Sequence, residues 1–283
     1  MTQSNAVWIH DAGGSGLRVA DQAQVSVFDH GFTVGDGVFE TLKVVDGQPF
    51  ALTRHLARLE RSALRLGLRA PDLTAINAAA CDTAKANATN LGDIGRMRIT
   101  YTSGSGPLGS QRSDAPPTWV IAVATTKPWP TQARLATVPW PRNERGALAG
   151  IKSTSYADNA LALAHANAQG ADEALLTNTL GLVCEGSGSN VFMVQNGRIS
   201  TPSVESGCLA GVTRELILEW WDVALDDFTL AELLAADEVF ITSSTRDIQS
   251  VGSIDGNRWP TSNPVTEQLI DLFGKRCGED LDP

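Results

Sequence analysis

The stretch Lys127-Pro128-Trp129-Pro130 divides this chain of 283 residues into two halves. Proline lacks an N–H and has a fixed φ, so two prolines in four residues can continue neither a strand nor a helix. The length is comfortable for two domains, each with a core of its own. We therefore expect an N-terminal domain over residues 1–126, a linker over 127–133 and a C-terminal domain over 134–283.

The first half reads as a small sheet followed by helices. Apolar alternation predicts strands at 25–29 and 38–45, and Asp46-Gly47 is a hairpin turn signal after the second. Thr53 is placed to cap a helix that ends near Gly67, because its hydroxyl can accept from a first-turn amide. The other expected elements are a helix over 72–87 and strands over 96–102 and 119–125.

The second half mixes short strands with helices, and Asn196-Gly197 predicts a hairpin turn between two of the strands. Together the halves predict a two-domain α/β or α+β enzyme. The expected strands lie near 134–139, 173–177, 191–195, 198–201 and 238–243, and the expected helices near 156–169, 212–221, 229–236 and 264–275.

Charge and cysteine content exclude several classes of function. The net charge of −10 and pI near 4.8 argue against nucleic acid or an anionic membrane as partner. The four cysteines are scattered without a CxxC pair, and the four histidines show no metal-ligand spacing, so we expect no metal. The N-terminus has no leader pattern and no apolar run approaches 18 residues, which favours a cytoplasmic protein.

The most specific chemical signal is a lysine followed by an isolated acid. Only five of the 22 basic residues are lysines, and Lys152 stands among Ser, Thr and Tyr after a glycine. Glu185 opens a Gly/Ser turn farther along. Pyridoxal 5′-phosphate needs both groups, a lysine for a Schiff base and an acid beside the pyridine nitrogen. Each residue alone reads equally well as an exposed surface charge, and only the pair in this order is informative.

A phosphate-binding segment is also predicted. The run into the helix at Val212-Thr213 offers amides and a hydroxyl to an anion, and Ser244 lies among hydroxyl residues after an apolar strand. Ordinary helix capping explains both segments as well. Arg58, one turn after His55, could supply a bidentate cation, although neighbouring arginines make a solvated helix face an equally simple interpretation.

Taken together, these motifs resemble those of the class IV aminotransferases, the fold type IV pyridoxal-phosphate enzymes. The family includes branched-chain and D-amino acid aminotransferases and 4-amino-4-deoxychorismate lyase. The resemblance covers nearly the whole chain. It rests on the segments Phe28-Asp29-His30-Gly31, Gly35 to Thr41, His55 to Leu59, Lys152, Glu185 to Phe192, Gly211 to Arg214, and Thr242-Ser243-Ser244.

The resemblance implies roles for individual residues. Lys152 would be the Schiff-base lysine and Glu185 the pyridinium partner. Arg58, Val212, Thr213 and Ser244 would hold the phosphate; Gly188, Leu209 and Gly211 would line the ring; Tyr156 would lie near its phenolic oxygen; Phe39, Thr41, Lys43 and Ser103 would face the substrate. The resemblance also implies a homodimer, with the cofactor between a small N-terminal α+β domain and a larger C-terminal mixed-sheet domain.

The family members differ in reaction. Thr41 stands where the lyases also carry threonine, and the loop beginning Thr102-Ser103 resembles the lyase loop, with serine where arginine is frequent. The leading hypothesis is therefore 4-amino-4-deoxychorismate lyase, in which Lys152 removes a proton, Thr41 or Lys152 returns one, and pyruvate and 4-aminobenzoate are formed. A branched-chain or D-amino acid aminotransferase that uses 2-oxoglutarate is the alternative. A non-catalytic protein that binds the cofactor is the minor alternative.

Overall fold

The structure, a computed structural model, describes residues 5–92 and 94–283. It divides into two compact units, each described by itself. The first contains the chain up to Pro128 together with 151–156 and 281–283, and the second contains 129–150 and 157–280. The first boundary falls inside the expected linker. The sequence predicts residues 151–156 and 281–283 as parts of the C-terminal domain, whereas in the structure they belong to the first unit.

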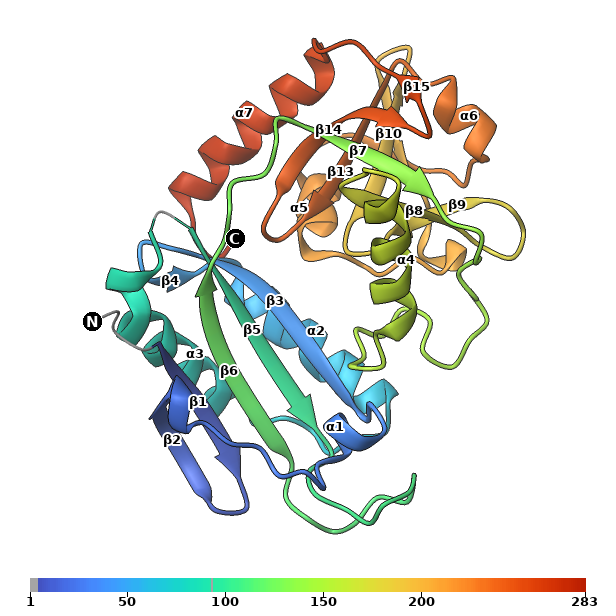
Figure 1. Ribbon diagram of the computed structural model, residues 1–283. Helices are drawn as coiled ribbons and strands as arrows, with labels where there is room; N and C mark the ends of the chain where they lie inside the picture. Colours follow the sequence, from blue (N-terminus) through green and yellow to red (C-terminus); the bar gives the residue numbers. More distant parts are fainter. Residues whose placement is uncertain (1–4, 93) are drawn as a thin grey trace. The chain divides into compact units, whose positions relative to one another are not determined.

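The first unit is built on a six-stranded antiparallel sheet with the order β2-β1-β6-β5-β3-β4. Figure 1 shows its long strands running side by side. The expected strand at 25–29 is not formed, because Val25, Val27 and Phe28 lie exposed in an irregular segment. The strands are β1 (Ala6–Asp11), β2 (Gly14–Val19), β3 (Gly37–Val45), β4 (Gln48–Pro49), β5 (Ile94–Thr102) and β6 (Thr118–Thr125).

Two helices cover one face of this sheet, α2 (Leu52–Arg65) and α3 (Leu73–Asn87) (Figure 1). They bury Leu56, Leu59 and Ile76 against the apolar residues of β3, β5 and β6. Asp72 caps α3 through the Ala75 amide. The predicted Thr53 cap of α2 is wrong, because the N-cap residue is Ala51 and it carries no capping side chain. Short helical turns complete the unit at η1 (Ala20–Gln22), α1 (His30–Thr33) and η2 (Ala88–Asn90).

The second unit contains a nine-stranded mixed sheet, in which β7 runs parallel to both β8 and β14 while β10 and β13 pair antiparallel. The expected hairpin at Asn196-Gly197 joins β10 and β11. The strands are β7 (Gln132–Thr137), β8 (Glu173–Thr177), β9 (Val183–Gly186), β10 (Asn190–Gln195), β11 (Arg198–Thr201), β12 (Val223–Leu225), β13 (Glu238–Ser243), β14 (Asp247–Ile254) and β15 (Asn257–Arg258).

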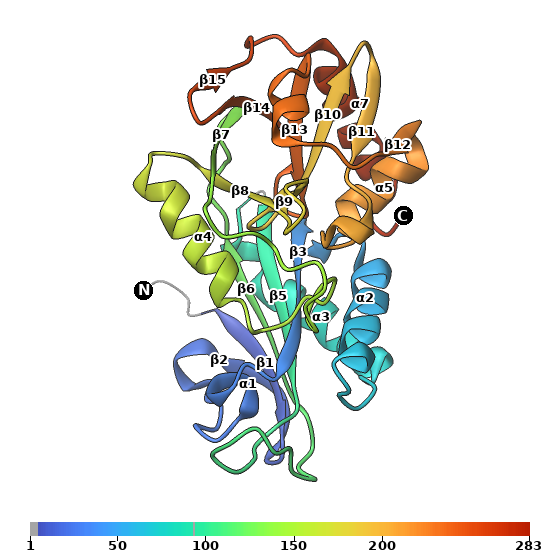
Figure 2. The same ribbon diagram turned by 90° about the vertical axis from the view of Figure 1, so that its right-hand side faces the viewer.

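The helices of this unit surround its sheet, as Figure 2 shows. Alanines of α4 (Ala157–Ala168) pack on β7 and β8, while α7 (Pro264–Glu279) packs on β13 and β14. The remaining helices are η3 (Val204–Ser206), α5 (Val212–Trp220) and α6 (Leu230–Leu234). The expected architecture of a small α+β unit and a larger mixed-sheet unit is confirmed.

Among residues 5–92 and 94–283, no helix is both long and apolar enough to cross a membrane. Within the same residues, no three His, Cys, Asp or Glu side chains gather as a metal site would require. Residues 1–4, where the sequence predicts no leader, lie outside the described part of the chain.

Candidate functional site

Lys152 is held against β3 in the first unit by backbone pairing. The Phe39 N–H donates to the Lys152 carbonyl oxygen at 2.9 Å, and the Thr154 N–H donates to the Gly37 carbonyl at 2.8 Å. Because β3 pairs with β5 along its other edge, this edge was open to the returning segment. Pairing therefore brings Lys152 into a unit whose continuous part ends at Pro128.

The Lys152 side chain lies among aromatic rings beside a second cation. Its Nζ is 4.5 Å from the centroid of the Phe39 ring and 5.6 Å from that of Tyr156, and the two rings meet edge to face. The Arg98 guanidinium carbon lies 3.5 Å from the Phe39 centroid. Burial lowers the pKa of Arg98, but arginine stays charged at any pH of interest. An amine and a fixed guanidinium thus share one aromatic ring.

The other predicted substrate residues follow the same face of the sheet. Side chains alternate along a strand, so Phe39, Thr41 and Lys43 of β3 share one face. Thr41 is paired with Arg98 of β5, and Lys43 is buried with its Nζ 4.4 Å from the Phe50 ring centroid. Lys152, Tyr156, Phe39, Thr41 and Arg98 are therefore neighbours within the first unit.

Ser103 lies apart from this face, at the residue that follows β5. Its N–H donates to the Asp36 carbonyl at 3.2 Å. The Asp36 carboxylate in turn accepts two hydrogen bonds from Arg112, at 2.6 and 2.7 Å. No contact links Ser103 to Lys152 among those described, so its substrate role stays a prediction.

Arg58 lies on the helix side of the sheet and is buried, so the solvated-face interpretation is wrong for it. Its Nε and Nη2 donate to the Glu40 carboxylate at 2.9 and 2.6 Å, and His55 Nδ1 lies 2.6 Å from the same carboxylate. Burial alone would raise the pKa of Glu40, but the Arg58 charge and these hydrogen bonds outweigh it and hold the pKa at about 2. For His55 burial has the opposite effect and lowers the pKa, because it disfavours the charged imidazolium.

Glu185 lies in the second unit, buried at the end of β9, and both of its carboxylate oxygens are engaged. Oε1 is 3.1 Å from Arg142 Nη2, and Oε2 accepts from the Leu209 N–H at 2.9 Å. Arg142 Nη1 also donates to Asn159 Oδ1 at 3.2 Å. The acid is thus held in one orientation by an arginine and a backbone amide, the arrangement that a partner for a ring N–H requires.

The loop that begins at Leu209 leads directly into α5. Asn190 Nδ2 donates to the Leu209 carbonyl at 2.8 Å, and a Cβ at Gly211 would collide with Asn190 Oδ1. The N-cap of α5, Gly211, supplies no side-chain hydrogen bond, and Val212 and Thr213 begin the helix buried. Beside this loop, Thr242 pairs with Asn190, and its buried hydroxyl has no hydrogen-bond partner.

These features fit a bound phosphate. The first amides of a nine-residue helix point out of its N-terminus and carry partial positive charge, so an anion satisfies them. The unpartnered Thr242 hydroxyl is a further donor. Ser244 is the residue directly after β13, two positions beyond Thr242, and Gly188 lies exposed in the turn after Glu185. The second unit therefore contains the predicted acid, the predicted ring-lining residues and three of the four predicted phosphate residues, whereas Arg58 belongs to the first unit.

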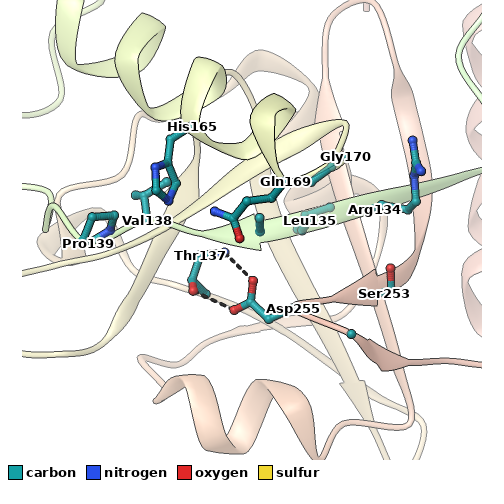
Figure 3. Close-up of a pocket in the computed structure, with 13 residues that line it drawn as sticks. Arg134, Leu135, Thr137, Val138, Pro139, His165, Gln169, Gly170, Ser253 and Asp255 are labelled. Atoms are coloured by element: carbon teal, nitrogen blue, oxygen red, sulfur yellow. Dashed lines mark hydrogen bonds between the residues drawn. The ribbon is translucent and has the colours of Figure 1, made fainter.

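A cavity of about 730 Å³ in the second unit involves none of the predicted residues. Figure 3 shows it between β7, the end of α4 and the turn after β14. Two of its polar lining groups are already paired, Thr137 with Asp255 and Arg134 with Asp172.

Sequence reasoning missed several residues that surround Glu40, Lys152 and Glu185. The Glu40–His55–Arg58 set was detectable in part, because His55 and Arg58 are one helical turn apart. Arg98 lies two residues before Thr100 in β5, so both side chains point to the same face, and strand alternation could have indicated this. Arg142, Asn159 and Glu173 carried no signal, because their partners lie in segments that only the folded sheet brings together.

Comparison with known proteins identifies relatives along the whole chain. The family model described as amino-transferase class IV matches residues 37–254. A Methanocaldococcus jannaschii protein provisionally named a branched-chain-amino-acid aminotransferase is 37% identical over 244 residues, which cover 83% of this chain and 84% of that protein. D-alanine aminotransferase of Listeria innocua is 31% identical, with 92% and 94% covered. Aminodeoxychorismate lyase of Bacillus subtilis is 34% identical, with 90% and 89% covered.

Solved structures agree with this similarity. The branched-chain aminotransferase of Thermoproteus uzoniensis with norvaline superposes with a TM-score of 0.88 at 28% identity, covering 96% of this chain and 94% of that one. A T.th. branched-chain amino acid aminotransferase with pyridoxamine 5′-phosphate gives a TM-score of 0.87 at 26% identity, with 97% and 94% covered.

Proposed function

We propose a function from one premise, that the chain belongs to the class IV aminotransferase family and uses pyridoxal 5′-phosphate. It has the two-domain fold type IV structure, with a small antiparallel N-terminal sheet and a larger mixed C-terminal sheet. The proposed reaction is transamination: an amino group passes from a branched-chain or D-amino acid to 2-oxoglutarate, giving a keto acid and glutamate. The relatives named as aminotransferases support this reaction over the lyase hypothesis.

The observation that carries the proposal is the placement of Lys152 and Arg98 at one aromatic ring, Phe39. Transamination needs an amine that moves a proton at the α-carbon of a substrate whose carboxylate is held nearby. Arginine binds carboxylates with a planar pair of donors. The Phe39 and Tyr156 rings provide apolar surface for a branched or small aliphatic side chain.

The cofactor supplies an electron sink that stabilises negative charge at the α-carbon when it is bound. Lys152 would hold the cofactor through its side-chain amine and, once the substrate amine has displaced it, would accept the proton that leaves the α-carbon. Glu185, oriented by Arg142 and the Leu209 amide, is proposed to keep the ring nitrogen protonated. The phosphate is assigned to Arg58, Val212, Thr213 and Ser244, with Gly188, Leu209 and Gly211 along the ring and Tyr156 at its phenolic oxygen.

Elimination of pyruvate from aminodeoxychorismate is the second candidate, supported by the Bacillus subtilis relative and by Thr41 beside Arg98. Thr41 would then donate the returning proton, and Lys43 and Ser103 would contact the substrate. We also retain two proposals drawn from the family resemblance and the cysteines. One is a homodimer, and the other is a reducing compartment, in keeping with four free cysteines.

The test mixes the purified protein and cofactor with L-leucine, L-valine or D-alanine and 2-oxoglutarate, and measures glutamate. A parallel assay offers aminodeoxychorismate and measures 4-aminobenzoate and pyruvate. Lys152→Ala should abolish turnover, whereas Lys85→Ala, on the exposed side of α3, should not change it. Product only from aminodeoxychorismate would replace transamination with the lyase reaction, and no product from any amine would remove both.

A further inference from the structure

Glu173, the first residue of β8, is a buried acid that neither the sequence analysis nor the proposed reaction uses. Its Oε1 accepts from the Ser187 N–H at 3.0 Å and from the Ser187 hydroxyl, and its Oε2 lies 3.3 Å from the Ser189 hydroxyl. Arg246 Nη2 donates to Oε2 at 3.1 Å. A carboxylate at 2% exposure is tolerated only with such a set of donors.

Three of these four donors belong to the turn that follows Glu185. The turn is packed closely, because a Cβ at Gly186 would collide with the Ser189 hydroxyl and lie 3.2 Å from the Ala174 carbonyl. Glu173 therefore fixes where the Ser187 peptide lies. The Ser187 carbonyl belongs to the next peptide unit, and Glu173 restrains it through Ser187 itself, whose N–H and hydroxyl both bind the buried carboxylate.

Two hydrogen bonds and an ion pair continue from Ser187 to Glu185. The Ser187 carbonyl accepts from Asn159 Nδ2 at 2.6 Å, and Asn159 Oδ1 accepts from Arg142 Nη1 at 3.2 Å. Arg142 Nη2 lies 3.1 Å from Glu185 Oε1. Since one end of the Asn159 amide donates and the other accepts, this relay has a single orientation.

At its other end, the relay is anchored to the segment after β13. Arg246 stacks on Trp129, with its guanidinium carbon 3.7 Å from the ring centroid, and donates to Gln249 Oε1 at 2.7 Å. Trp129 Nε1 donates to the Thr245 carbonyl at 2.9 Å. The buried pair of Glu173 and Arg246 thus links the turn after Glu185 to the segment that contains Ser244.

We propose that Glu173 is a positioning residue that sets the orientation and charge environment of Glu185 through Ser187, Asn159 and Arg142. The inference rests on the proposed role of Glu185 at the cofactor's ring nitrogen. If the relay shifts, Arg142 moves relative to Glu185, and the affinity of the ring nitrogen for its proton changes. Glu173 touches neither cofactor nor substrate, so it acts only through these neighbours.

The experiment measures the ¹⁵N chemical shift of the ring nitrogen in protein loaded with ¹⁵N-labelled pyridoxal phosphate, as a function of pH. Glu173→Gln keeps the size of the side chain and removes its charge. Its matched control is Glu238→Gln, a buried acid of the same unit that accepts from the Val265 and Thr266 amides, away from the relay. Glu185→Gln sets the scale of the signal.

The expected result is that Glu173→Gln moves the titration midpoint of the ring nitrogen in the same direction as Glu185→Gln, by on the order of one pH unit. Glu238→Gln should leave the midpoint in place even where it lowers thermal stability as much. An unchanged midpoint in Glu173→Gln, with a response in Glu185→Gln, would show that Glu173 is only a structural brace and would overturn the proposal.

Asn159→Ala keeps the proposal testable if Glu173→Gln does not fold. It removes the link between the Ser187 carbonyl and Arg142 but leaves the buried acid with its partners. We expect the same direction of shift in Asn159→Ala alone and, where Glu173→Gln folds, no additional shift in the double variant. If the unaltered protein shows no ring-nitrogen signal that responds to Glu185→Gln, the proposed role of Glu185 fails first, and this inference with it.

Discussion

The two units hold their buried acids in different ways. Glu40 of the first unit is contacted directly by His55 and Arg58, two side chains one turn apart on the same helix. Glu185 of the second unit is held by a backbone amide and by Arg142, which is itself fixed through further hydrogen bonds. One acid depends on a single helix, and the other depends on several strands and loops.

This difference teaches where each cluster is vulnerable. In a compact buried charge pair, each charge is compensated mainly by its partner. Loss of one partner therefore leaves an uncompensated charge in a site without water. A relay distributes its energy over several contacts, and each of its hydrogen bonds contributes modestly to stability. We therefore expect stability to respond most to changes near Glu40, and function to respond most to changes near Glu185.

The largest stability effect is expected for Glu40→Ala. The change leaves the buried Arg58 without its acid, which typically costs about 3–5 kcal/mol. The measurement is the free energy of unfolding from urea titration of the apo-protein. Asp82→Ala, at an exposed position of α3, is the control and should stay within about 0.5 kcal/mol of the unaltered protein. Equal losses in the two variants would mean that the Glu40 cluster contributes little.

Acid should destabilise the same cluster. The pKa of Glu40 is about 2, well below its ordinary 4.5, so the unfolded chain binds the proton more tightly. The stabilisation is fully present above about pH 4.5 and is lost as the pH falls towards 2, by about 3 kcal/mol in total. The pKa of His55 is also lowered, so the unfolded chain binds this proton more tightly as well. The stability that comes from a neutral His55 therefore begins to decrease as the pH falls below 6.5.

Urea titrations between pH 7 and pH 2 measure this loss. In Glu40→Gln the part between pH 4.5 and 2 should shrink, because no carboxylate remains to take up the proton. A profile for Glu40→Gln that runs parallel to the original would assign the acid sensitivity to other groups.

In the second unit, the close packing behind Glu185 is the sensitive feature. In Gly186→Ala the new methyl would meet the Ser189 hydroxyl and the Ala174 carbonyl, and overpacking of this kind costs about 1–3 kcal/mol. Gly188→Ala, two residues along, is the matched control, because the nearest atom to its Cβ would be 4.0 Å away. Thermal unfolding of the apo-protein compares them. A Gly186→Ala variant as stable as its control would show that the turn yields easily.

The elements that sequence reasoning predicted well are those fixed by local chemistry. The α3 helix begins after its Asp72 cap, and the hairpin at Asn196-Gly197 has both residues at positive φ. The Lys152 and Glu185 motifs were recognisable because each carries its small neighbours with it in sequence. Local rules thus predicted these elements and singled out Lys152 and Glu185 as candidates.

The features that sequence reasoning could not predict depend on segments distant in sequence. The pairing of 152–154 with β3 places Lys152 in the first unit, and no local pattern marks an open strand edge as its destination. Arg142 pairs with Glu185 because β9 and the loop after β7 meet in the folded sheet. Periodicity and capping rules describe neighbours along the chain, so they cannot identify such partners.

The smallest of the expected effects concerns the cap that sequence reasoning assigned to Thr53. The Thr53 amide donates to Asp282 Oδ1 at 2.9 Å and its hydroxyl donates to Oδ2 at 2.5 Å, while the Ala51 N–H donates to the Leu281 carbonyl. Asp282 thus caps α2 from the far end of the sequence. Asp282→Ala should cost about 1 kcal/mol, as loss of a helix cap does. Faster hydrogen exchange at the Thr53 amide should accompany the loss.

Glu279→Ala, at an exposed position near the end of α7, is the control for this change and should alter neither quantity. If both variants behave alike, Asp282 does not act as a cap. Because His55 and Arg58 follow within the first two turns of α2, fraying from the missing cap should reach His55 before Arg58. The Glu40 cluster would then depend on a residue more than two hundred positions away in sequence. The surroundings of Glu40 and of Glu185 would in that case differ less than their direct contacts indicate.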